Sequence, residues 1–176
     1  MNIKGVIYQS ASGHVKRYAE MLGQQLDIPI FDLFSALPKL NKKDEVIFIG
    51  WVRNRDFMGY GLMLKRYSVK AVCAVGAVED EYSQYVLDRI NRRYHISDKA
   101  PLFYLRGGFN PKLNRGSDRK IGSALIDDLA KKVTRSQKKN IQVDPYDQAL
   151  LSALTRGGDF VSNDNLIKVI QWYNNN

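Results

Sequence analysis

The sequence has little cysteine, little histidine and no long apolar run. With Cys73 as the only cysteine, no internal disulfide can form, and its apolar neighbours are typical of a buried strand. No stretch approaches the ~20 apolar residues that a membrane-spanning helix needs. The short apolar run at the start is broken by Lys4, which disfavours a signal peptide. We therefore expect a cytoplasmic protein without a transmembrane segment.

Several common site signatures are also missing. The first strand is not followed by Gly-x-Gly-x-x-Gly, and the chain has neither a Gly-x-x-x-x-Gly-Lys-Ser/Thr loop nor a Gly-x-Ser-x-Gly turn. His14 and His95 lack further ligands at metal-binding spacing. These absences disfavour a dinucleotide site, an NTP-hydrolysing site, a serine hydrolase and a zinc site.

The 176 residues, 44% hydrophobic and 26% charged, suit one domain spanning 1–176. Short apolar runs rich in β-branched residues predict five strands, and apolar residues spaced by three and four predict helices between them. This alternation favours an α/β fold, with a parallel sheet between two layers of helices. The predicted strands are 3–8, 28–31, 45–50, 70–76 and 101–105, and the predicted helices are 14–26, 62–67, 81–94, 117–134 and 164–172.

Positive charge dominates, with a net charge of +9. Most of the excess lies between Arg106 and Lys139, a segment that contains ten basic residues and three acidic ones. A basic face can attract nucleic acid, an anionic lipid surface or an acidic protein. The alternative is a solvated helix face without a partner.

The segment between the first strand and the first helix is small, polar and glycine-containing. A helix start at the carboxyl end of a strand presents free backbone N–H groups that suit a phosphate. Serine hydroxyls add donors, and Gly13 lets an anion approach the backbone. The alternative is a serine-capped helix start that binds nothing. The expected phosphate-binding residues are Ser10, Ala11, Ser12, Gly13, His14 and Val15.

This loop resembles the phosphate loop of the flavodoxin family, T/S-x-T-G-x-T, with Val15 in place of the last Thr. The resemblance implies bound FMN and a flavodoxin-like three-layer sandwich with a five-stranded parallel sheet in the order 2-1-3-4-5. Residues 101–110, an apolar strand followed by Arg106-Gly107-Gly108, further resemble the subgroup that includes the flavin-dependent protoporphyrinogen dehydrogenases.

The resemblance also implies that two further loops hold the flavin ring. After Gly50, Trp51 is the first candidate for stacking on the ring and Tyr60 the second. After the next strand, Tyr82 is a candidate for the opposite face. Trp51 could instead anchor the core, and Tyr82 also fits the apolar stripe of the following helix. The expected ring-binding residues are Trp51, Val52, Asn54, Gly76, Val78 and Tyr82.

Two functions follow as hypotheses. The first is electron transfer or flavin-dependent oxidoreduction, as a carrier or an enzyme, with an acidic redox protein or an anionic small molecule as partner. Carrier flavodoxins are typically acidic, so the basic chain departs from them. The second is a flavin-free binding module that uses the 106–139 face for an acidic partner, nucleic acid or membrane surface. Nucleic acid is disfavoured because no aromatic-plus-basic recognition pattern occurs.

Overall fold

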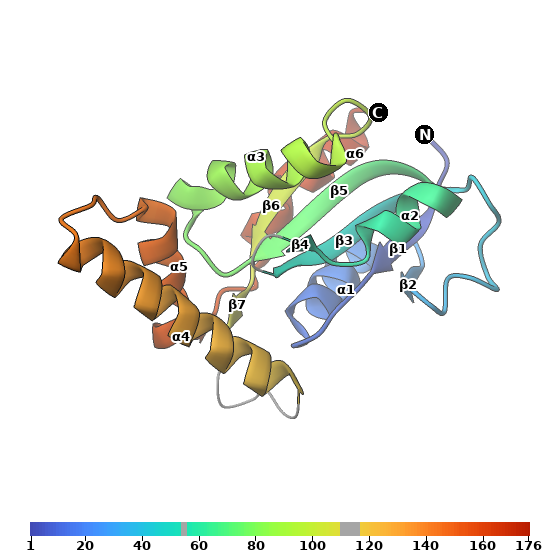
Figure 1. The fold of residues 1–176 in the computed structure, drawn as a ribbon. Coiled ribbons are helices and arrows are strands. Elements are labelled where there is room, and N and C mark those ends of the chain that lie inside the picture. Colours follow the sequence, from blue (N-terminus) through green and yellow to red (C-terminus); the bar gives the residue numbers. More distant parts are fainter. Residues whose placement is uncertain (54–55, 110–116) are drawn as a thin grey trace.

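Buried strands alternate with amphipathic helices along most of the chain and build an α/β fold around a mostly parallel sheet (Figure 1). The computed structural model describes residues 1–53, 56–109 and 117–176. Five strands pair in parallel in the order β2-β1-β3-β5-β6. They are β1 (Ile3–Tyr8), β2 (Ile30–Asp32), β3 (Glu45–Arg53), β5 (Ser68–Gly76) and β6 (Leu102–Arg106).

The sequence prediction of five strands in the order 2-1-3-4-5 needs correction, because the sheet has six strands and this path carries a branch. Strand β3 runs on through Trp51 to Arg53, where the sequence predicts a loop. Strand β4 (Asp56–Phe57) pairs in antiparallel fashion with this last part of β3. A separate two-stranded sheet joins β7 (Gly108–Phe109) to β8 (Gly158–Asp159).

The two central strands β3 and β5 are covered on both faces. Residues 46–50 and 71–75 are buried without interruption, which explains their continuous apolar runs. In β1 the side chains alternate, so Val6 packs into the core on one face of the sheet and Ile7 into the core on the other.

Helices cover both faces of the sheet. The apolar stripe of α1 (His14–Leu26) packs on one face beside α6 (Ile167–Asn174), which follows the short 3-10 helix η2 (Asn163–Leu166). On the other face lie α2 (Tyr60–Arg66) and α3 (Ser83–Tyr94), the latter preceded by the 3-10 helix η1 (Asp80–Tyr82). In the described part of the chain no helix combines the length and the apolar character needed to cross a membrane.

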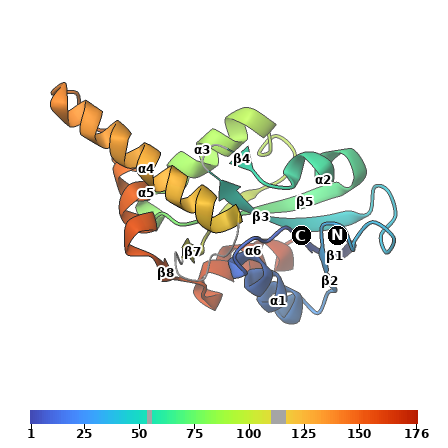
Figure 2. The same ribbon diagram turned by 60° about the horizontal axis from the view of Figure 1, so that its bottom comes forward.

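A helical hairpin of α4 (Ser117–Lys138) and α5 (Pro145–Arg156) lies beyond the end of the sheet, and the carboxyl-terminal half of α4 projects away from it (Figure 2). Helix α5 is not among the helices predicted from the sequence. The Asp144 side chain caps α5 by accepting a hydrogen bond from the Tyr146 N–H, and Pro145 occupies its first turn.

Candidate functional site

The candidate site is a pocket at the carboxyl end of the sheet, beside the ends of β1, β3 and β5. From β1 the chain passes to β2 on one side and then crosses to β3 on the other. Open α/β sheets bind ligands where the strand order reverses in this way.

The loop after β1 is held in shape by its own hydrogen bonds. The Gln9 N–H donates to the Ile49 carbonyl at 3.0 Å, and the Gly13 N–H donates to Ser10 Oγ at 3.1 Å. Gly13 has φ of 93°, a left-handed conformation that favours glycine, and a Cβ at this position would meet no atom of the described residues within 4 Å. Within the part of the chain that the structure describes, the backbone at Gly13 is therefore open to an anion.

Helix α1 starts at His14, and its N-cap residue Gly13 provides no side-chain cap. The first N–H groups of a helix have no intrahelical partner, and they carry the positive end of the helix dipole. Together with the Ser10 and Ser12 hydroxyls, they form a set of donors that fits a phosphate group.

His14 links this loop to the carboxyl-terminal part of the chain. Its Nδ1 lies 2.8 Å from Ser12 Oγ, and its Nε2 lies 4.0 Å from Asp159 Oδ1 on β8. Burial lowers the pKa of His14, and nearby Arg17 lowers it further, whereas Asp159 opposes these effects. The imidazole is therefore neutral at pH 7.

The Ser12–His14 pair is not arranged as a hydrolytic triad. The third group, Asp159, is beyond hydrogen-bond distance of His14, and it forms an ion pair with Arg17. We assign the pair to shaping the loop rather than to nucleophilic chemistry.

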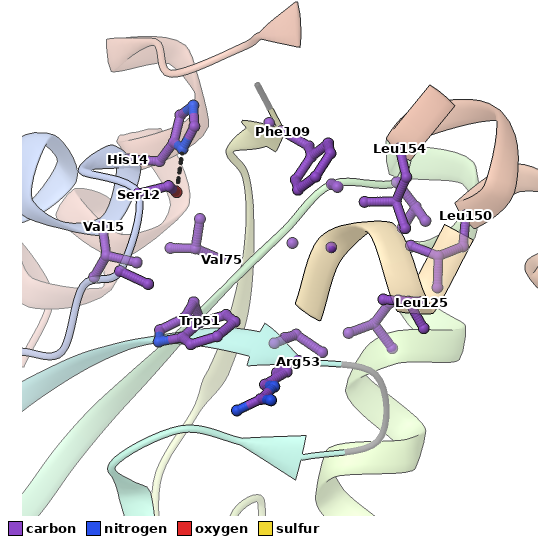
Figure 3. Close-up of a pocket in the computed structure, with 18 of the residues that line it drawn as sticks. Ser12, His14, Val15, Trp51, Arg53, Val75, Phe109, Leu125, Leu150 and Leu154 are labelled. Atoms are coloured by element: carbon purple, nitrogen blue, oxygen red, sulfur yellow. Dashed lines mark hydrogen bonds between the residues drawn. The ribbon is translucent and has the colours of Figure 1, made fainter. Parts of the chain in front are cut away.

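Next to the loop is a largely apolar cavity of about 130 Å³. Figure 3 shows Trp51 and Val75 on its sheet side, with Leu125, Leu150 and Leu154 facing them. The exposed residues Ala11 and Ser12 mark its open side. The cavity is smaller than the ~300 Å³ of common ligand pockets. It can enclose part of a flat ring system, while the rest would lie at the opening beside the loop.

Most of the residues predicted from the sequence meet at this cavity. Ser10 and Gly13 shape the loop without lining the cavity, and Asn54 lies outside the described residues. Those that line the cavity are Ala11, Ser12, His14, Val15, Trp51, Val52, Gly76 and Val78.

Two predicted aromatic residues lie elsewhere. Tyr60 is only 1% exposed and packs against Phe48 and Phe57 in the core, where burial raises its pKa to about 12. Tyr82 lines a neighbouring cavity of about 350 Å³.

That neighbouring cavity is lined by charged as well as apolar residues. Glu79 lies 3.4 Å from Arg106 and 3.8 Å from Arg156, and the Arg106 guanidinium stacks 3.8 Å from the centre of the Phe160 ring. The two cavities share Ala77, so they lie on either side of the chain that leaves β5. Glu79 offsets part of the arginine charge beside the apolar cavity.

Sequence reasoning missed the wall opposite Trp51. It is built by Phe109 on β7, Leu125 on α4, and Leu150 and Leu154 on α5. The spacing of Leu150 and Leu154 by four, after the Asp-Pro start of a helix, was the available signal for α5. Nothing in the local pattern indicated that these leucines face the loop after β1.

Searches against family models, curated proteins and solved structures found no match to this chain. The chemistry of the site therefore stands on its geometry. A donor-rich loop beside an apolar cavity suits a ligand that carries a phosphate at one end and a flat apolar ring system at the other.

Proposed function

We propose that the chain binds FMN at this site and takes part in electron transfer or flavin-dependent oxidoreduction. The observation that carries the proposal is the meeting of an open, donor-rich loop and an apolar cavity at the β1/β3 switch point. The resemblance of residues 8–15 to the flavodoxin phosphate loop supports the same ligand, and the path β2-β1-β3-β5-β6 supports a flavodoxin-like sheet.

In this proposal the phosphate is held by the first N–H groups of α1 and by the hydroxyls of Ser10 and Ser12. The Val15 side chain has no hydroxyl to donate, and it is buried in the core with Tyr18 and Leu22. Where the flavodoxin loop has a Thr hydroxyl, this chain has an apolar side chain whose packing fixes the start of α1.

The ring of FMN would lie against Trp51 and Val75, on the sheet side of the cavity. FMN supplies one-electron and two-electron redox chemistry when bound. The leucines of α4 and α5 keep water from the inner end of the cavity. The net charge of +9 favours an acidic redox protein or an anionic substrate as the partner.

The test compares FMN with riboflavin, which lacks the phosphate. Ser12→Glu places a carboxylate in the proposed phosphate site, so we expect FMN to bind at least about tenfold more weakly, with riboflavin unaffected. Quenching of flavin fluorescence during titration measures both affinities. The matched control is Ser97→Glu, which makes the same change at an exposed residue in the turn before β6.

Equal loss of FMN and riboflavin affinity would place the ring, rather than the phosphate, at Ser12. A folded wild-type protein that leaves gel filtration without flavin absorption, and does not quench added FMN, would contradict the proposal. That result would favour the flavin-free binding module, because the α4 part of the 106–139 segment carries exposed basic residues around a shallow hollow.

A further inference from the structure

The carboxyl-terminal end of α4 and the turn after it form a projecting end of the molecule, which we call the basic tip (Figure 2). All of its residues are exposed, and several of them line a shallow hollow together with Asp128 and Ser136. The basic tip consists of Lys131, Lys132, Arg135, Lys138, Lys139 and Ile141.

Most of the charge on the basic tip is not neutralised within the described residues. Lys132 forms an ion pair with Asp147 on α5. The other four basic side chains form no ion pair with any described residue. The basic tip therefore carries five positive charges. The acids beside it are Asp147, which pairs with Lys132, and Asp128, which lines the same hollow.

Ile141 is held in place at this tip by the end of α4. The Asn140 N–H donates to the Gln137 carbonyl at 3.1 Å, and the Ile141 N–H donates to the Ser136 carbonyl at 2.9 Å. With Asn140 at φ of 52°, these bonds form a Schellman motif. The motif fixes where the backbone of Ile141 lies.

The apolar contact that usually accompanies a Schellman motif is missing here. The residue after the left-handed position normally packs on an apolar side chain one turn back in the helix. In this chain those positions hold Arg135 and Ser136, and Ile141 is left 58% exposed. An apolar side chain is thus presented at a fixed position among cations.

We propose that the basic tip docks on an anionic membrane surface. Cations spread over a projecting end can meet a flat anionic surface together, and each one strengthens such binding about fivefold. Ile141 can then enter the region of the lipid headgroups, as apolar residues of interfacial segments do. The hollow around Arg135 suits the phosphate of a headgroup.

A membrane fits this tip better than a single-stranded nucleic acid does. Proteins that bind single strands stack bases on aromatic side chains. Among the described residues lining the hollow, none is aromatic. The exposed apolar side chain here is aliphatic, and it suits a lipid environment.

The experiment measures sedimentation of the full chain with phosphatidylcholine vesicles, with or without about one third phosphatidylglycerol. We expect binding to the anionic vesicles only, and we expect it to weaken as salt is raised. The triple variant Lys131→Glu, Arg135→Glu and Lys139→Glu should lose at least about a hundredfold in affinity.

The matched control is Lys42→Glu, Lys65→Glu and Lys99→Glu, which changes the net charge equally at exposed residues away from the tip. It should bind far better than the triple tip variant. Ile141→Ser should weaken binding several-fold without changing its salt dependence. This result would separate the apolar contribution from the charges.

Two outcomes would overturn the proposal. Equal binding by the tip variant and the control would show only a general attraction of a basic protein to anions. Tighter binding to a nucleic acid oligonucleotide than to vesicles, abolished by the tip variant, would assign the tip to nucleic acid. Neither result depends on whether FMN binds.

Discussion

The two walls of the cavity are built by different physical means. The sheet-side wall comes from the loop after β1 and from the carboxyl ends of β3 and β5, and backbone hydrogen bonds fix it. The opposite wall comes from β7, α4 and α5, and leucine side chains form most of it. The first wall is therefore as rigid as the sheet, whereas the rigidity of the second wall depends on how its side chains pack.

This difference matters for binding. A rigid loop can hold a small charged group with fixed donors, because little reorganisation is needed. The leucine wall can adapt to the shape of an apolar group where its side chains are less deeply buried. Leu125 is half-buried, for example, whereas Phe48 in the sheet has no exposed surface. Three predictions test this comparison.

The largest effect should come from deleting core volume beneath the sheet. Phe48→Ala should cost about 3–5 kcal/mol of unfolding free energy, because the ring is fully buried. Leu125→Ala on the opposite wall should cost about 1 kcal/mol, because its side chain is only half-buried. Urea unfolding followed by circular dichroism measures both. Equal losses would show that the leucine wall is as firmly packed as the sheet.

A smaller effect is expected where the two regions join. The buried Tyr18 hydroxyl of α1 donates to the Arg106 carbonyl at the end of β6, and it accepts a hydrogen bond from the Asn165 side chain on η2. Tyr18→Phe leaves both groups without this partner and should cost about 1–3 kcal/mol. If thermal unfolding of Tyr18→Phe matched the wild type, this junction would not contribute to stability.

The smallest effect concerns the dependence of stability on pH, and it arises from His14 at the start of α1, on the sheet-side wall. Burial lowers the pKa of His14 from 6.5, so the unfolded chain takes up this proton more readily. Stability should fall as pH drops below about 6.5 toward the folded pKa of His14.

The His14→Asn variant should lose this part of the pH dependence. Chemical unfolding of both proteins at a series of pH values above the carboxylate range provides the measurement. Parallel curves for the two proteins would mean that His14 is not responsible. The variant His95→Asn serves as the control, because it removes an exposed imidazole.

Much of the fold could be predicted from local patterns. The predicted ranges 3–8 and 14–26 match β1 and α1, because a short run rich in β-branched residues is typical of a buried strand and the spacing of apolar residues by three and four reflects the buried face of a helix. The predicted end of the third strand at Gly50 was wrong, because Trp51 still pairs in parallel with Val75 of β5, and Val52 and Arg53 then pair with β4. Pairing with a later segment cannot be predicted from the residues of the strand itself.

The candidate site divides in the same way. The loop around Ser12 and Gly13 could be located from the sequence, because turn chemistry and helix starts depend on a few consecutive residues. The ion pair of Arg17 with Asp159 joins residues 142 positions apart, and no local pattern predicts it. The resemblance to flavodoxins makes Tyr82, in the loop after the predicted strand 70–76, a candidate for the flavin ring, but the 3-10 turn η1 places it at the neighbouring cavity.

Three properties follow from the order of the amino acids alone: the alternation of strands and helices, the donor-rich loop after the first strand and the excess of positive charge. These properties depend on short-range spacing and composition, which the chain carries in any conformation. Two others depend on how the chain packs: α4 and α5 close the cavity opposite Trp51, and Ile141 remains exposed at the end of a basic helix. Both results arise from packing between distant segments, where shape decides which apolar side chains find partners and which do not.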